Sequence, residues 1–109
     1  MSNEKVFAKM EKFAAKKKSN KVIDLMKKAD NETLIKALES LAQIADEDSC
    51  NMITHFLDNP ADEIRVAACK AALAINTEYM KTRVRYQLQT EQNAEVKKEI
   101  QEAFNKANA

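Results

Sequence analysis

The sequence predicts an all-α fold, and three features of the chain support this class. Its 109 residues include no glycine and one proline, which disfavours tight hairpins, and are rich in helix-forming Ala, Lys, Glu and Leu. Apolar residues recur with helical spacing along the chain. This pattern itself repeats about every 30 residues, which predicts stacked helix pairs in a single domain over residues 1–109.

The repeat is clearest in an apolar stripe at positions i, i+4, i+7 and i+8, which is the buried face of an amphipathic helix. Between successive stripes lie shorter apolar pairs four residues apart, and these follow the same period. The stripes are Val6-Met10-Phe13-Ala14, Leu34-Leu38-Leu41-Ala42, Ile64-Ala68-Ala71-Ala72 and Val96-Ile100-Ala103-Phe104, and the pairs are Val22-Met26, Met52-Phe56 and Val84-Leu88.

Polar residues mark where the helices begin. Side chains such as Asp30 and Asp46 accept from the free backbone N–H groups of a first turn, and Pro60 suits a first turn as well. Without glycine, the helix ends must use asparagine, lysine or water. We therefore expect seven helices, at 3–17, 20–28, 31–44, 48–57, 61–75, 77–89 and 93–106.

Short loops make consecutive helices antiparallel, so these segments form three helix pairs and one terminal helix. The units are 3–28, 31–57 and 61–89, followed by the helix 93–106. A compact four-helix bundle fits seven short segments poorly. Stacked units of this size, each in contact with its neighbours, form an α-solenoid.

The segment from Asn59 to Ala72 has an Asn-Pro turn, an acidic residue at Asp62 or Glu63, an Ile64-Arg65 step and an alanine-rich helix. With these features it resembles a HEAT repeat, most closely the short bacterial form related to phycobilisome-lyase-type HEAT-like repeats. A fainter copy begins at Asn93. The resemblance implies a right-handed α-α superhelix. The tetratricopeptide repeat is excluded because its Leu-Gly step needs a glycine.

The resemblance also implies a structural role for Arg65. In the family, this arginine often bonds turn carbonyls or acids of the adjacent unit, and here we expect Asp62 or Asp30 as its partner.

No set of residues predicts a catalytic or metal centre, and no cofactor is expected. His55 is the only histidine, and Cys50, five residues earlier, points about 140° away around the helix. Cys50 and Cys69 are interpreted as reduced packing residues of a cytoplasmic protein, although a reactive thiol at Cys50 stays open. The acids at 46–48 are interpreted as helix caps.

Charge is distributed in blocks although the net charge is +1. Residues 1–28 carry nine lysines against three acids, and residues 29–63 carry nine acids against one lysine. The lysine-rich segment is the candidate for binding nucleic acid without sequence preference. Its residues are Lys12, Lys16, Lys17, Lys18 and Lys21. The acidic block argues against a continuous basic groove.

A binding ridge follows from the resemblance, because the second helices of HEAT-like pairs line the concave face. Within the third pair, Tyr79, Arg83 and Tyr86 share one face, and tyrosine and arginine are favoured binding anchors. The registered positions of the second helices form the candidate ridge, which consists of Lys21, Asp24, Asn51, Thr54, His55, Arg83, Tyr86 and Gln87, with Leu25 in the same register as His55.

These observations favour a non-enzymatic interaction module, a small scaffold or adaptor that binds a protein or peptide. The alternatives are nucleic-acid binding through the first unit and an enzyme of the chromophore-attaching lyase branch. No apolar run is long enough to span a membrane, and the first five residues lack a signal-peptide core. The apolar end helices, with Phe7 at one end and Phe104 at the other, could also pair with a second copy.

Overall fold

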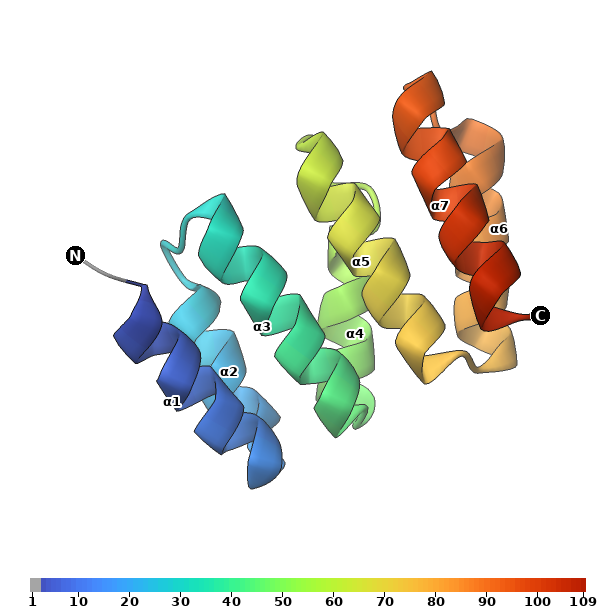
Figure 1. The fold of residues 1–109 in the computed structure, drawn as a ribbon. Coiled ribbons are helices and arrows are strands. Elements are labelled where there is room, and N and C mark those ends of the chain that lie inside the picture. Colours follow the sequence, from blue (N-terminus) through green and yellow to red (C-terminus); the bar gives the residue numbers. More distant parts are fainter. Residues whose placement is uncertain (1–2) are drawn as a thin grey trace.

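The computed structural model describes residues 3–109, and that range contains seven α-helices and no strand. Figure 1 shows α1, α3, α5 and α7 side by side in one layer, with α2, α4 and α6 behind them. The predicted all-α solenoid of three helix pairs and a terminal helix is confirmed. The helices are α1 (Glu4–Ala15), α2 (Ser19–Met26), α3 (Asn31–Ile44), α4 (Glu47–Phe56), α5 (Asp62–Ile75), α6 (Glu78–Thr90) and α7 (Ala94–Ala107).

The core lies between the two layers and follows the predicted stripes. Leu38 and Leu41 of α3 and Ile64 of α5 are completely buried, as are Met10 of α1 and Ile100 of α7. Full burial of each such side chain contributes about 1.5–3 kcal/mol. The terminal helix α7 packs against both α5 and α6.

Most of the predicted helix starts are confirmed. The Asp30 side chain accepts from the backbone N–H of Thr33 at 2.9 Å, and the Asp46 side chain does the same for Ser49. Thr77 and Asn93 cap α6 and α7 in the same way. These bonds occupy backbone donors that a helix otherwise leaves free.

Two predicted starts differ from the structure. Pro60 lies before the helix, because the Asn59 side chain accepts from the Ala61 N–H at 2.9 Å and the first helical residue is Asp62. Ser19 begins α2 but does not cap it. Its hydroxyl instead donates to the carboxylate of Asp46 in the next unit, at 2.7 Å.

The absence of glycine is visible where the helices end. Lys17, Lys28, Ala45 and Asn76 have φ between 56° and 59°, the left-handed conformation that glycine adopts most easily. Lysine and asparagine were expected at these positions, and Ala45 is an addition. Each of these residues other than asparagine carries a steric cost that glycine would not have.

Candidate interaction surfaces

The predicted ridge lies on the layer formed by the even-numbered helices. Lys21 and Asp24 are exposed on α2. Asn51 and His55 are exposed on α4 and line a hollow of about 470 Å³ between α2 and α4. The His55 ring meets the Phe56 ring edge-on at 5.2 Å, which gives this histidine an aromatic neighbour on the surface.

On α6, two of the predicted anchors form a defined pair. The Arg83 guanidinium donates to the Tyr79 hydroxyl at 3.0 Å and lies 5.8 Å from the centre of the Tyr79 ring. Tyr79 and Tyr86 are 57% and 62% exposed, the most exposed large hydrophobic side chains of residues 3–109. This end of the ridge therefore presents aromatic surface.

Three predicted ridge residues are less accessible than the others, and one of them, Arg83, is half-buried. Gln87 is buried, and its side-chain amide donates to the Glu91 carboxylate at 3.0 Å, so it adds little to the exposed surface of the ridge. Thr54 is half-buried, and its hydroxyl oxygen is enclosed with no hydrogen-bond partner within residues 3–109.

The larger hollow lies on the opposite layer, where no binding surface was predicted. It is a groove of about 880 Å³ along the outer side of α3, α5 and α7. We call it the α5 groove. Its lining comprises seven apolar residues (Ile35, Ala42, Val66, Ala67, Ala71, Ala74, Val96), five acids (Glu39, Asp62, Glu63, Glu95, Glu99), and Lys70, Gln43 and Asn93.

The depth of this groove comes from the small side chains of α5. Ala67, Ala71 and Ala74 recur at spacings of four and three residues, so they lie on one face of the helix. Larger side chains of α3 and α7 stand on either side of this alanine face. The sequence already shows that this helix is alanine-rich, and the groove is a consequence of the small size of these side chains.

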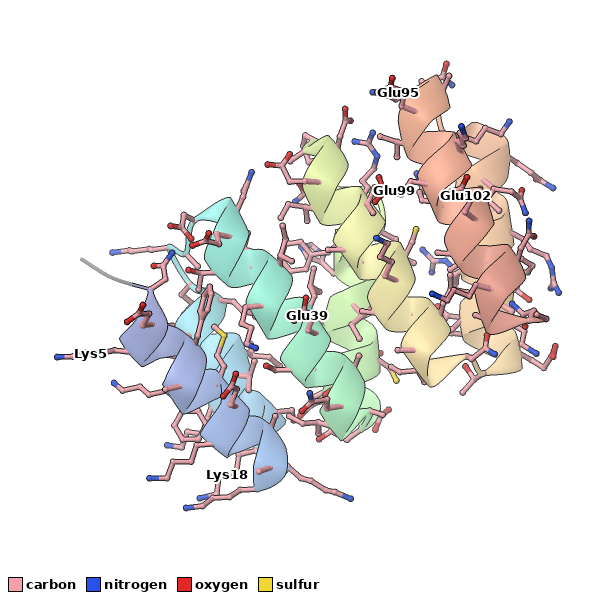
Figure 2. All side chains as sticks on the ribbon, in the orientation of Figure 1. Lys5, Lys18, Glu39, Glu95, Glu99 and Glu102 are labelled. Atoms are coloured by element: carbon pink, nitrogen blue, oxygen red, sulfur yellow. The ribbon has the colours of Figure 1, made fainter. Side chains whose placement is uncertain are left out.

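The rims of the α5 groove are acidic. Figure 2 shows Glu39 on α3 and Glu95 and Glu99 on α7, with Lys5 and Lys18 at the far end of the molecule. Glu99 pairs with Lys70 at 3.1 Å. Among residues 3–109, the carboxylates of Glu39 and Glu95 have no ion pair or hydrogen-bond donor. The rim was not predicted; the i, i+4 spacing of Glu95 and Glu99, which places both on one helix face, is the sequence signal that indicates it.

One end of the groove is held by a buried charged network around Arg65. Its Nε and Nη2 atoms donate to the two carboxylate oxygens of Glu91, at 3.0 and 2.8 Å. Its Nη1 atom donates to the carbonyls of Asn59 and Pro60, and Nη2 also pairs with Asp62. The expected Asp62 partner is confirmed, whereas Asp30 is wrong because the guanidinium extends toward the following unit.

This network shifts the protonation of its members. The bidentate bond from Arg65 holds the pKa of Glu91 below its usual value, helped by Gln87 and the Asn93 N–H and opposed by burial. The same bond raises the pKa of Arg65 further above its usual value. Both groups therefore stay charged, although the Glu91 side chain is only 1% exposed and the Arg65 side chain only 14% exposed. The network joins α5 to the turn between α6 and α7.

A family model of HEAT repeats matches residues 19–105 of the chain. The match covers most of the length, including the turn at Asn59–Arg65 whose bonding is described above. This chain belongs to the HEAT-repeat family. No curated protein and no solved structure gives a significant match. The likeness to the phycobilisome-lyase-type branch stays a prediction.

In this HEAT-repeat protein, five of the nine lysines of residues 1–28 lie at or near the turn between α1 and α2. Lys12 lies on α1, residues 16–18 connect α1 to α2, and Lys21 lies in the first turn of α2. All five lysines are exposed, and none of them has an acidic partner within residues 3–109. The structure therefore brings the whole nucleic-acid candidate together at one end of the solenoid.

Both cysteines of the HEAT repeats are free thiols. Burial, with a smaller contribution from Glu91, raises the pKa of Cys69 to about 12. Burial and then the Asp46 carboxylate raise the pKa of Cys50, which is opposite to the lowering that a helix start would give. Both thiols therefore stay protonated at neutral pH. Among residues 3–109, no cluster of three or more His, Cys, Asp or Glu is arranged to hold a metal ion, and no helix could cross a membrane.

Proposed function

We propose that this HEAT-repeat protein is a non-enzymatic interaction module, a small scaffold or adaptor that holds a protein or peptide segment in the α5 groove. HEAT repeats are generally modules for protein interaction. The observation that carries the proposal is the groove itself, which spans three helices of one layer and has an apolar floor between polar rims. Such concave apolar surfaces with a few polar groups favour binding.

The test is affinity capture from lysate with wild-type protein and two variants. Ala74 is exposed at one end of the groove, so Ala74→Trp obstructs the groove there without entering the core. The matched variant His55→Ala/Tyr86→Ala alters the opposite layer. We expect a discrete partner that survives nuclease treatment, is lost with Ala74→Trp and is retained by the other variant. Retention by Ala74→Trp would contradict the groove as the binding surface.

The ridge of the even-numbered helices is the second candidate surface for a protein partner. The exposed Tyr86 and the Tyr79–Arg83 pair support it, as does the hollow beside Asn51 and His55. Loss of the partner with His55→Ala/Tyr86→Ala, and not with Ala74→Trp, would move the proposal to this ridge. Lys21 and Asp24 would then extend it along α2.

Nucleic-acid binding is the alternative function, and the exposed lysine cluster around the α1–α2 turn favours it. Neutralised phosphates release counterions, so such binding weakens steeply with salt. A variant with Lys16, Lys17 and Lys18 changed to Gln should abolish it. Absence of any duplex or single-strand binding at low salt would remove this alternative.

A role in the cytoplasm is part of the proposal, supported by two unpaired cysteines, one of which is fully buried. Pairing of two copies through the end helices is a further prediction. In both end helices, a cation of a neighbouring helix partly covers the aromatic ring. The Lys36 ammonium lies 5.9 Å from the centre of the Phe7 ring, and the Arg85 guanidinium lies 5.3 Å from the centre of the Phe104 ring. Sedimentation velocity over a range of concentrations tests this pairing.

A further inference from the structure

We infer that the occupant of the α5 groove is a basic amphipathic helix of a partner protein, with apolar residues toward α5 and Lys or Arg toward both rims. This inference rests on the proposed function and specifies the chemistry of the partner.

The first argument is charge. Five carboxylates and one ammonium line the groove, and that ammonium, Lys70, already pairs with Glu99. Glu39 on the α3 rim and Glu95 on the α7 rim have no cation among residues 3–109. Cations on a partner would therefore find carboxylates on both sides. Complementary charge of this kind steers encounter and selects partners.

The second argument is shape. The groove follows α5 from Asp62 to Ala74, which at the rise of an α-helix corresponds to roughly 18 Å. An occupant of about 12 helical residues has this length. The alanine face leaves room for larger apolar side chains, such as Leu or Met, spaced at i, i+3 and i+4. A helix that lays an apolar face in such a groove is a recurrent mode of peptide recognition.

A second copy of this chain fits the groove less well, although its first unit is rich in lysine. The exposed side of α1 carries Lys5, Lys9 and Lys12. Its large apolar side chains are covered to different degrees, because Met10 is fully buried in the molecule's own core and Phe7 and Phe13 are half-buried. The copy would supply cations without fully exposed apolar anchors. A nucleic acid fits worst, because its phosphates would face five carboxylates.

The experiment compares three labelled helical peptides of about 16 residues that share one apolar face and carry Lys, Gln or Glu at the polar positions. Fluorescence anisotropy at low and high salt gives the affinities for full-length protein. We expect the Lys peptide to bind at least about tenfold more tightly than the Gln peptide, with an advantage that shrinks at high salt. The Glu peptide should not bind.

Matched variants locate the effect. Glu39→Gln/Glu95→Gln should weaken the Lys peptide about tenfold, toward the affinity of the Gln peptide. The control Glu47→Gln/Asp58→Asn removes two exposed charges at the ends of α4, on the opposite layer, and should leave binding unchanged. Ala74→Trp should abolish binding of the Lys peptide.

Each other outcome overturns a defined part of the argument. Equal affinities for the Lys and Gln peptides would overturn the basic partner and leave the groove as a peptide site. Equal losses in the groove variant and the α4 control would overturn a localised site. No binding by any peptide would overturn the amphipathic helix, while the lysate capture with Ala74→Trp independently decides whether the groove binds a protein. A dimer in sedimentation velocity that is lost with Ala74→Trp would indicate a second copy as the occupant.

Discussion

The contact between α5 and α7 (the α5–α7 junction) and the contact between α1 and α3 (the α1–α3 junction) each join the first helices of neighbouring units. They differ in the ion pair that links the two units. At the first, Arg65 and Glu91 form a bidentate pair that is nearly removed from water. At the second, Lys36 pairs with Glu11 at 3.1 Å, and the Glu11 side chain is 67% exposed. Apolar stripes pack the helices together at both junctions. The ion pairs differ in exposure, because the Arg65–Glu91 pair is buried and the Glu11 side chain is largely exposed.

The difference shows where this solenoid is sensitive to substitution. A buried charge that loses its partner stays desolvated, whereas an exposed one regains water. The α5–α7 junction also borders the α5 groove, because Asp62 and Asn93 belong to both. Its integrity therefore sets the shape of the candidate site.

The largest expected effect comes from Glu91→Ala. This change leaves the Arg65 guanidinium and the Gln87 amide buried without their main acceptor, so the free energy of unfolding should fall by about 3–5 kcal/mol. Urea unfolding measures it. A loss below about 1 kcal/mol, similar to that of an exposed pair, would contradict the distinction between the two junctions.

Acid should weaken the α5–α7 junction selectively. The pKa of Glu91 is lower in the folded protein than its ordinary value of 4.5, so this group stabilises the fold above about pH 4.5. That contribution is lost as pH falls through the lower folded pKa. Unfolding free energies of wild type and Glu91→Gln should therefore converge as the solution is acidified. Parallel pH profiles would show that Glu91 does not titrate differently in the folded state.

The residues that end α3 and α5, Ala45 and Asn76, offer a second comparison, because they share a backbone conformation and differ in side chain. Ala45 and Asn76 both adopt the left-handed conformation, but the Asn76 side-chain amide also donates to the Ala107 carbonyl at 3.4 Å. Ala45→Gly should raise the free energy of unfolding by about 1 kcal/mol, because glycine removes the steric cost. Asn76→Gly should gain less because it loses that contact. Thermal unfolding of both variants provides the measurement, and equal gains would argue against a role for the amide.

The smallest expected effect is at the α1–α3 junction. A double-mutant cycle of Glu11→Ala and Lys36→Ala should give a coupling of about 0.2–1 kcal/mol that decreases with salt. A coupling of several kcal/mol would place this pair in the same class as Arg65 and Glu91. The same cycle on the exposed Lys70–Glu99 pair of the groove is the control, and its coupling energy should be of similar size.

Local features of this protein were predictable from its residues. The apolar stripes located the core, and the side chains of Asp30 and Asp46 cap the helices that they precede. The motif around Arg65 indicated the family and the bond to Asp62. The pairing with Glu91 and the burial of Gln87 were not predicted, because both depend on how the α6–α7 turn meets α5.

The sequence by itself determined the helices, their pairing and the buried stripes, because helix periodicity and capping depend on residues a few positions apart. Only the tertiary structure decided which face is hollowed and which charges line it. Glu39, Ala74 and Glu95 lie on three different helices, and they share one groove because the packing of α3, α5 and α7 sets the space between them. The pairing of Arg65 with Glu91 also depends on tertiary structure, because the packing of the next unit places the Glu91 carboxylate within reach of the long Arg65 side chain.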